Sequence, residues 1–426
     1  MSLDVAAIKA DFPILSRKVR GVPLIYLDSG ATSQKPRSVL EAERSFYETS
    51  NAAVHRGAHA LAEEATDAYE AARASIAGFV GAMSDEIIFT KNATEAINLV
   101  AYAFSNATAK AQQGIDVDPR FVIEPGDNIV VTEMEHHANL VPWQELCAKT
   151  GAQLRWFGIT DNGRLDLDSD PIDNKTKFVS IVHQSNILGT INPVSEIMDR
   201  AHRVGALGLV DMCQSVPHMP VDVKNIGADF AAGSGHKMLG PTGIGILWGR
   251  KNLLNSMPPF LTGGSMIEMV HMDGSTYAQA PARFEAGVPM VAQAVGLAAG
   301  IDYLNAIGMD KIFEHEHQLT EQLLQGLNSM PGVRIIGPHD SRDRGSAVSF
   351  VVDGIHPHDV GHIMDSHGVA VRVGHHCAWP VCRRFDVPAT TRITPYLYND
   401  SSDIDAALNS IESAQAFFKP TAGARS

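Results

Sequence analysis

The chain has 426 residues, of which 45% are hydrophobic and 19% are charged, a length that accommodates two or three packed domains. Its net charge of −14 argues against nucleic acid and anionic membranes as partners, because both require clustered Lys and Arg. No apolar stretch approaches the roughly 18 residues of a spanning helix. The first residues lack the basic segment and apolar region of a signal peptide. Four cysteines are too few for a disulfide framework in a chain of this length, so we expect a cytoplasmic protein.

Four segments begin with a short apolar run, continue with a polar or Gly-rich turn and then become helix-like: residues 86–104, 127–151, 177–190 and 206–216. In the second of these, Pro142 near the start and Gly151 just past the end bracket a helix. Alternating strands and helices predict an α/β fold, with a mostly parallel sheet covered by helices on both faces.

After about residue 295 the pattern changes to long helices, around 291–304 and 312–327, followed by short strands around 347–354 and 369–374. We therefore expect a large domain at 26–295 and a smaller α+β domain at 296–426. The N-terminal segment 1–25 is expected to pack with the smaller domain.

Unusual polar residues follow the apolar runs: Thr94, His136, Asn186, Asp211 and Lys237. If the runs are strands of one open α/β sheet, these residues lie at the carboxyl ends of strands, where ligands bind.

Residues 92–95 stand between a strand and a helix, where backbone N–H groups and the helix dipole favour an anion such as phosphate. The alternative is an ordinary cap, with Thr94 accepting from the first turn. Lys237 ends a Ser-Gly-His-Lys run beside several glycines, and a lysine in a sheet-end cleft can serve as an imine-forming nucleophile. The alternative is a surface lysine on a glycine loop.

Asp211 needs a cationic or hydrogen-bonding partner if it is buried, and a pyridinium nitrogen would supply one. His136 could stack on the same ring. A phosphate cradle, an imine-forming lysine, a carboxylate for a ring nitrogen and a stacking histidine together indicate pyridoxal 5′-phosphate.

Residues 372–382 contain two histidines and two cysteines, but their spacing matches no common zinc motif, so we expect no metal. Cys377, on a polar glycine-flanked loop, is a candidate reactive thiolate, with a buried structural thiol as the alternative. Cys382 and Cys147 are expected to be packing residues. Arg392 is a candidate clamp for a carboxylate, with a surface ion pair as the alternative.

At this point the sequence resembles the SufS-type (group II) cysteine desulfurases, in the aminotransferase class V branch of the fold-type I pyridoxal-phosphate enzymes. The similar segments run nearly from end to end: YLDSGATSQKP, AAVHRGAH, FTKNATEAINLVA, TEMEHHANLVPWQ, QSVPHMPVDV, SGHKMLGPTGIGILWGR, PPFLTGGSMI, RFEAG and RVGHHCAWP. The resemblance implies conversion of L-cysteine to L-alanine, with the sulfur passing to an enzyme persulfide for iron–sulfur cluster assembly.

The resemblance also implies roles for individual residues. Lys237 would bond the cofactor covalently and remove the substrate α-proton, Asp211 would face the pyridine nitrogen, and His136 would stack on the ring and handle protons. Gln214 would bond the phenolic oxygen. The phosphate would be held by Thr94, Ser234, His236 and the amide of Ala93.

The substrate carboxylate would be received by Asn186 and Arg392, with Arg372 close by, and Cys377 would accept the sulfur. The resemblance implies a homodimer in which His55, Arg56 and the RFEAG loop reach the partner's cofactor. It also implies a small SufU-like or SufE-like sulfur acceptor. We expect His358 to meet a zinc ion of such a partner, the alternative being that it caps the helix that follows it.

Four positions depart from the family pattern: Gly233, the pair Met212-Cys213, Val288, and Ile393-Thr394-Pro395. None of them changes Lys237, Asp211, His136 or Cys377, so we expect the same reaction class, with any effect limited to cofactor affinity and substrate fit. A selenocysteine lyase or cysteine-sulfinate-type lyase on the same scaffold is the nearest alternative. A non-catalytic assembly subunit is a more distant one.

Overall fold

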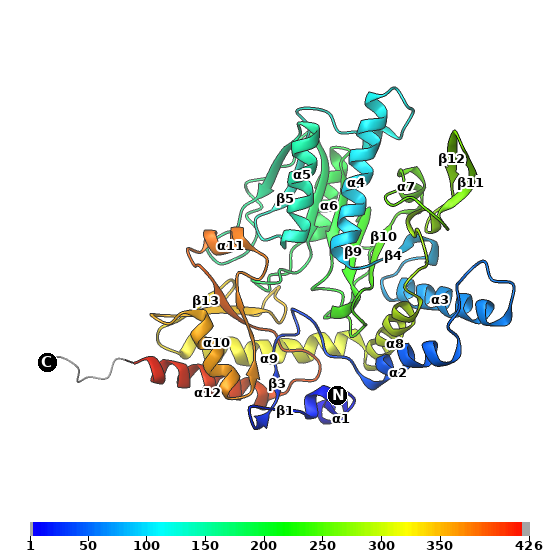
Figure 1. Cartoon of the computed structure of the whole chain (residues 1–426). Helices are drawn as coiled ribbons and strands as arrows, with labels where there is room; N and C mark the ends of the chain where they lie inside the picture. The colour runs from blue at the N-terminus through cyan, green and yellow to red at the C-terminus, as the bar shows by residue number, and fades with distance from the viewer. Residues whose placement is uncertain (1–2, 420–426) are drawn as a thin grey trace.

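A computed structural model describes residues 3–419, and its centre is a seven-stranded sheet (Figure 1). The spatial order of the strands is β4-β10-β9-β8-β7-β5-β6. Their bounds are β4 Ile87–Thr90, β5 Asn128–Thr132, β6 Gln153–Phe157, β7 Thr176–Val182, β8 Leu207–Asp211, β9 Phe230–Ser234 and β10 Gly245–Gly249.

One strand of this sheet runs against the others. β10 is antiparallel to both of its neighbours, β4 and β9, whereas β9, β8, β7, β5 and β6 pair in parallel. The carboxyl ends of all strands except β10 therefore meet at one edge of the sheet. The prediction of a mostly parallel sheet is confirmed.

Helices cover both faces of the sheet. Ile129 and Val131 of β5 belong to one buried apolar cluster, and Val130 between them belongs to another, as the two-residue period of a strand requires. The first cluster includes side chains of α4 (Ala93–Gln112) and α5 (Val141–Thr150). The second includes side chains of α3 (Ala60–Phe79), α6 (Val194–Arg203) and α8 (Val291–Ile307).

The predicted signals of α5 are confirmed. Pro142 stands in its first turn, and Gly151 follows its end at φ 77°, in the left-handed region that favours glycine. The prediction of a helix-like stretch directly after β8 is wrong, because residues 213–218 form turns. Pro217 and Pro220 lack the N–H that a helix needs there. After β7, likewise, no helix begins before Val194.

A second, antiparallel sheet lies in the C-terminal part, with the order β13-β14-β17-β16. Its strands are Val333–Ile336, Val348–Val352, Thr390–Ile393 and Arg372–Gly374 respectively. Helices α9 (Met309–Ser329), α10 (Pro357–Ser366) and α12 (Ser401–Phe418) share its apolar core, and Figure 1 shows them at the base of the molecule.

The chain reaches this smaller core a second time near its start. β3 (Ile25–Tyr26) pairs in parallel with β15 (Val369–Ala370), and Leu27 is buried in the core of the C-terminal sheet. The chain then crosses to α2 (Arg37–Thr49), which packs with α3 against α8. The division at residues 25 and 295 stays a prediction.

Among the helices of residues 3–419, none has the length and apolar character needed to cross a membrane.

Candidate active site

A cavity of about 250 Å³ lies at the carboxyl edge of the large sheet, against the C-terminal sheet. Its walls contain almost every site residue predicted from the sequence: Ala93, Thr94, His136, Asn186, Asp211, Gln214, Ser234, His236, Lys237, Arg372, Cys377 and Arg392. Two predicted residues, His55 and Arg56, do not line it.

Lys237 stands at the end of a short 3-10 turn, Gly235–Lys237, that directly follows β9. A Cβ at Gly235 would lie 2.8 Å from a side-chain carbon of Ile244 and 2.9 Å from its carbonyl oxygen, so only glycine permits this close approach. The turn brings Lys237 to the cavity wall beside Ser234 and His236.

The N-terminus of α4 forms one end of the cavity. The side chain of Asn92 accepts from the N–H of Glu95 at 3.0 Å and caps this helix. The alternative that Thr94 is the cap is therefore wrong, and Thr94 lines the cavity instead. The Ala93 N–H, which the resemblance assigns to a phosphate, donates to Ser234 Oγ at 2.9 Å.

Asp211 ends β8, and its side chain lines the cavity although the residue is only 3% exposed. Its Oδ1 accepts from the N–H of Cys213 at 3.0 Å. Three residues later, Gln214 Nε2 donates to the carbonyl of Gly30 at 2.8 Å. The end of β8 and the turn after it therefore place the buried carboxylate of Asp211 and the side-chain amide of Gln214 in the cavity wall.

His136 lies across the same cavity and is held in a defined state. Its Nδ1 accepts from the N–H of Ala138 at 3.1 Å, so the proton of the neutral ring is on Nε2. Burial and the nearby Lys237 ammonium lower the pKa of His136 to about 4. At neutral pH the ring is therefore uncharged and suited to stack on an aromatic ligand.

Arg392 brings a buried guanidinium to the cavity from β17. It is 2% exposed, and it donates from Nη1 to the carbonyl of Asn186 at 2.8 Å and from Nη2 to Asp28 at 3.3 Å. Its Nε is a buried donor that has no acceptor within the described part of the chain. Arg372, on the neighbouring strand β16, donates from Nε to the same Asp28 at 3.2 Å. Burial lowers the pKa of Arg392 to about 10.

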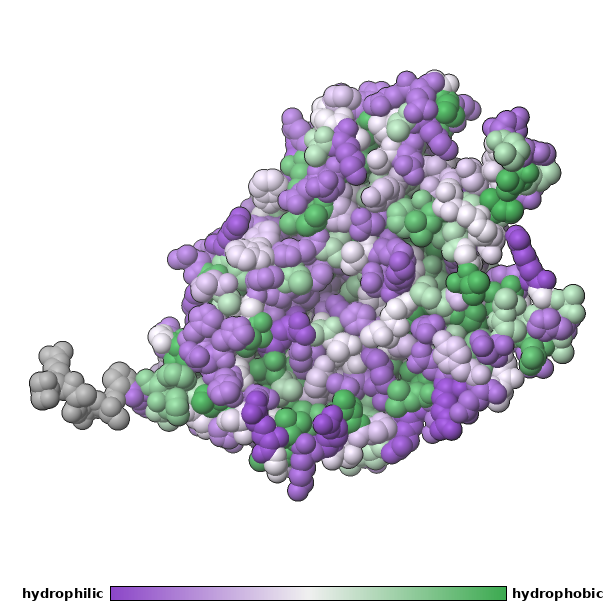
Figure 2. Space-filling view, in the orientation of Figure 1, coloured by the Kyte–Doolittle hydropathy of each residue, from purple (hydrophilic) through white to green (hydrophobic). Residues whose placement is uncertain are grey.

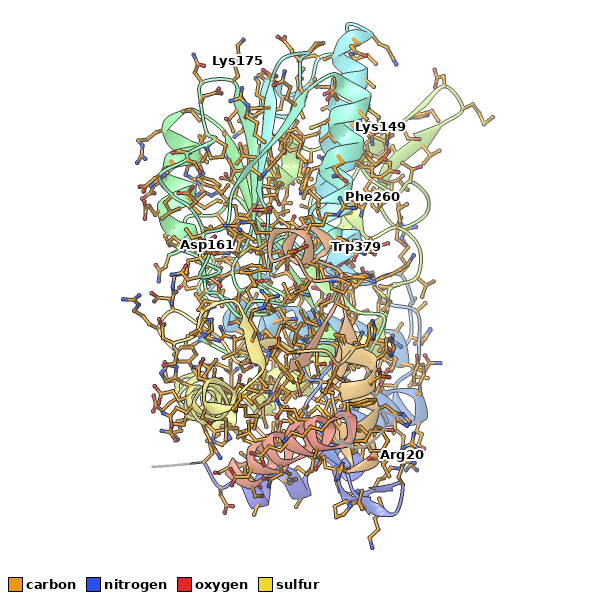
Figure 3. All side chains as sticks on the ribbon, turned by 90° about the vertical axis from the view of Figure 1, so that its left-hand side faces the viewer. Arg20, Lys149, Asp161, Lys175, Phe260 and Trp379 are labelled. Atoms are coloured by element: carbon orange, nitrogen blue, oxygen red, sulfur yellow. The ribbon has the colours of Figure 1, made fainter. Side chains whose placement is uncertain are left out.

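Cys377 is exposed and lies on the loop between β16 and α11 (Trp379–Arg384). Its carbonyl accepts from the N–H of His137 at 2.7 Å, and His137 Nε2 in turn accepts from the N–H of Trp379 at 3.1 Å. On the other side, Asn186 Nδ2 donates to the carbonyl of His376 at 2.6 Å. His137 and Asn186, which lie at the carboxyl edge of the large sheet, therefore hold the loop on both sides of Cys377. Figure 3 shows α11, with Trp379 labelled, between the large sheet above and the C-terminal helices below.

Other predicted residues lie elsewhere. His55 is exposed and contacts Glu70 through Nε2 at 3.0 Å, so a role in the site of a partner stays a prediction. Cys147 and Cys382 are buried in apolar clusters, as expected of packing residues. Within residues 3–419, no three His, Cys, Asp or Glu side chains are grouped as a metal site would require.

Three residues of the site were not predicted from the sequence to act there: Asp28, Gly30 and His376. Asp28 holds two arginines, Gly30 anchors Gln214 and lines the cavity, and His376 lines it as a buried ring. The available signal was the YLDSGATSQKP segment, which places an acid and a glycine just after a short apolar run.

Comparison with known proteins agrees with this geometry. Residues 25–407 match the aminotransferase class-V family model. A probable cysteine desulfurase of Streptomyces coelicolor is 57% identical over 420 residues, which cover 98% of both chains. Probable cysteine desulfurase 2 of Mycobacterium leprae is 56% identical over 417 residues, again 98% of both chains. The chain belongs to the aminotransferase class-V family, and within it to the cysteine desulfurases.

Solved structures of such desulfurases share the fold. The apo enzyme of Thermococcus onnurineus superposes with a TM-score of 0.89 at 39% identity and covers 98% of this chain and 99% of its own. The Escherichia coli cysteine desulfurase CsdA superposes with a TM-score of 0.86 at 34% identity, over 98% of this chain and 100% of its own.

Proposed function

We propose that this cysteine desulfurase uses pyridoxal 5′-phosphate to convert L-cysteine to L-alanine and leaves the sulfur on Cys377. The observation that carries the proposal is that one cavity brings together an amine, a buried carboxylate, a buried guanidinium and an exposed thiol. These groups belong to Lys237, Asp211, Arg392 and Cys377.

The residues of the cavity fit this cofactor. Asp211 is a buried carboxylate that forms no ion pair within residues 3–419, and a pyridinium N–H would give it a charged hydrogen-bond donor. The α4 N-terminus with Thr94, Ser234 and His236 would hold the phosphate. When bound, the cofactor supplies an electron-withdrawing ring that accommodates negative charge developing at the substrate Cα.

The protein's own groups account for the other steps. Arg392 and Asn186 orient the substrate carboxylate, for which Arg392 provides a planar fork of donors. The Lys237 amine acts as the base that removes the α-proton of the substrate. The Cys377 thiolate then attacks the substrate sulfur, so that an S–S bond forms as the substrate C–S bond breaks. The electron pair of that bond returns to the substrate carbon, which takes up protons, and the product is L-alanine.

Incubation with L-cysteine tests the proposal directly. The purified protein is expected to be yellow, and borohydride reduction followed by peptide mapping should place the cofactor on Lys237. Cys377→Ala should keep the colour and lose desulfuration of cysteine. An adduct on another lysine, or a colourless protein after incubation with pyridoxal 5′-phosphate, would refute the site.

A selenocysteine lyase on the same scaffold is the second candidate, because it would use the same cofactor residues. A selenocysteine lyase would depend less on Cys377 than a cysteine desulfurase does. A Cys377→Ala variant that retained full activity with cysteine would favour the lyase, whereas loss of activity with cysteine would support the desulfurase.

We also propose that the protein acts as a homodimer. Hairpin β11–β12 (Ile267–His271 and Gly274–Tyr277) exposes Met269, Val270 and Met272, and Figure 2 shows apolar side chains at its position on the upper right. Such exposed apolar groups are typical of protein interfaces. Val288, in the loop after RFEAG, is also exposed. Sedimentation of the parent and of a Met269→Glu/Val270→Glu variant tests this, since only the variant should be monomeric.

A cytoplasmic role in iron–sulfur cluster assembly, with a SufU-like or SufE-like sulfur acceptor, completes the proposal. His356, rather than His358, caps α10, since its side chain accepts from the N–H of His358 at 3.2 Å. The cap alternative for His358 is therefore wrong. This exposed ring, which stacks on that of His356 with the centroids 5.8 Å apart, would be the group that meets a partner's zinc. His358→Ala should keep the basal rate of alanine production and lose stimulation by a SufU-like acceptor. Equal stimulation of both proteins would refute this role.

A further inference from the structure

Residues 32–35, a segment near the start of the chain, lie against the turn that carries Lys237. Four donor atoms of this segment converge on one acceptor, the carbonyl oxygen of His236. They are Ser33 N at 3.1 Å, Thr32 Oγ1 at 3.1 Å, Ser33 Oγ at 3.0 Å and Lys35 Nζ at 2.9 Å. This carbonyl belongs to the peptide bond that joins His236 to Lys237, so the segment fixes the backbone immediately before the reactive lysine.

The same segment also holds the backbone after Lys237. Ser33 Oγ accepts from the N–H of Leu239 at 3.0 Å. Leu239 is fully buried at φ 60°, a left-handed conformation that is unusual for a bulky residue and that its surroundings must maintain. Lys237 is therefore held from both sides by one segment that is about 200 residues away in sequence.

Lys35 is the only charged member of this segment, and its partners are unusual for a lysine. Its Nζ donates to the His236 carbonyl, to the Ser33 carbonyl at 2.6 Å and weakly to Ser33 Oγ at 3.5 Å, all of which are uncharged oxygens. Burial lowers the pKa of Lys35 to about 8. Hydrogen bonds from an ammonium are stronger than those from neutral donors, so Lys35 is the member whose removal should loosen the carbonyl most.

We propose that Lys35 is a positioning residue that helps the protein to hold and orient its cofactor. It acts on Lys237 through the carbonyl of His236. The inference rests on the proposed function, since it requires the cofactor to be bound at Lys237. Lys35 does not line the cavity, so its effect on the cofactor would pass through the turn that carries Lys237. Its effect is to restrict the turn so that the Lys237 amine and the His236 ring keep their places at the cavity wall.

The test compares Lys35→Met, Lys35→Arg and Lys18→Met with the parent, all as holoenzymes. Methionine keeps most of the length of the side chain and removes the charge, whereas arginine keeps the charge. Lys18 is an exposed lysine of the same N-terminal part and serves as the matched control. The readouts are the rate of cofactor loss on dilution and the visible circular dichroism band of the bound cofactor, which reports its orientation.

For Lys35→Met we expect cofactor loss to be faster by about tenfold or more, together with a changed dichroism band. Lys35→Arg and Lys18→Met should resemble the parent. Identical cofactor loss and dichroism in Lys35→Met and Lys18→Met would overturn the inference. This holds even if Lys35→Met unfolds at a lower urea concentration, because a loss of stability alone shows only a structural role.

If Lys35→Met does not fold, Thr32→Val removes another of the four donors with little change in shape. It should shift both readouts in the same direction by a smaller amount, and parent-like behaviour would again overturn the inference. A parent protein that carries no cofactor on Lys237 would instead refute the proposed function. The two failures are therefore distinguishable.

Discussion

Asp28 and Arg392 form an ion pair, Nη2 to Oδ1 at 3.3 Å, although 364 residues separate them in sequence. The pair joins the crossing segment after β3 to the strand that carries the predicted carboxylate clamp. Because Asp28 also accepts from Arg372, one carboxylate orients both arginines of the cavity wall.

Arg392→Lys should therefore weaken substrate binding, although the substitution keeps the positive charge. A lysine offers a point charge in place of a planar fork and leaves Asp28 and the Asn186 carbonyl with fewer donors. Losing a buried, hydrogen-bonded charge interaction costs about 2–5 kcal/mol, which is about 30-fold or more in affinity. Steady-state kinetics with L-cysteine should show the change mainly as a higher KM. An unchanged KM would mean that the substrate carboxylate binds elsewhere.

Asp211→Asn should retain the cofactor and slow the reaction. The amide has the same shape as the carboxylate but lacks the charge that would stabilise a pyridinium nitrogen. A hydrogen bond to a charged group contributes about 1.5–3 kcal/mol, which corresponds to a rate about 10–150 times lower. The rate of alanine production at saturating cysteine measures this change. A parent-like rate would remove Asp211 from the proposed site.

Glu285→Ala should destabilise the folded protein. Glu285 accepts two hydrogen bonds from Arg73, at 2.7 and 2.9 Å, and Arg73 is 2% exposed. Breaking a buried pair by removing one partner costs about 3–5 kcal/mol because the other charge stays buried. Glu70 contacts the same arginine from a half-exposed position, so Glu70→Ala is the matched control, with an expected cost of about 0–1 kcal/mol. Urea unfolding compares them, and equal losses would contradict this account.

Acid should destabilise the folded protein in part through His183. The residue is 8% exposed, and burial lowers its pKa to about 4 from the ordinary 6.5. Between these values the unfolded chain binds more protons than the folded one, so the free energy of unfolding falls as pH falls. The slope is about 1.4 kcal/mol per pH unit for one histidine.

His183→Asn removes this titration and keeps a polar side chain. Urea unfolding at pH 5 and pH 7 should therefore show a smaller difference for the variant than for the parent. If both proteins lost the same free energy of unfolding between these pH values, His183 would not be a source of the acid sensitivity.

The sequence predicted the sheet and most of the cavity because both depend on local patterns. A strand such as β5 alternates two buried faces, and polar residues such as His136 and Asp211 lie after or at the ends of strands that meet at one edge. What could not be predicted depends on contacts between distant segments. Nothing near Asp28 shows that it faces two arginines from the C-terminal sheet. Likewise, Thr94 and Asn92 are both acceptable caps, and only the structure decides between them.

The most direct test of the central claim is a single-turnover reaction with L-cysteine, in which alanine and protein-bound persulfide are quantified together and the persulfide is located by mass spectrometry of peptides. We expect one alanine for each persulfide, with the added sulfur on Cys377 and none on the buried Cys147, Cys213 or Cys382. The Cys377→Ala protein should form neither product while retaining its cofactor. Alanine released without a persulfide on Cys377, or formed equally well by the variant, would show that Cys377 is not the sulfur acceptor.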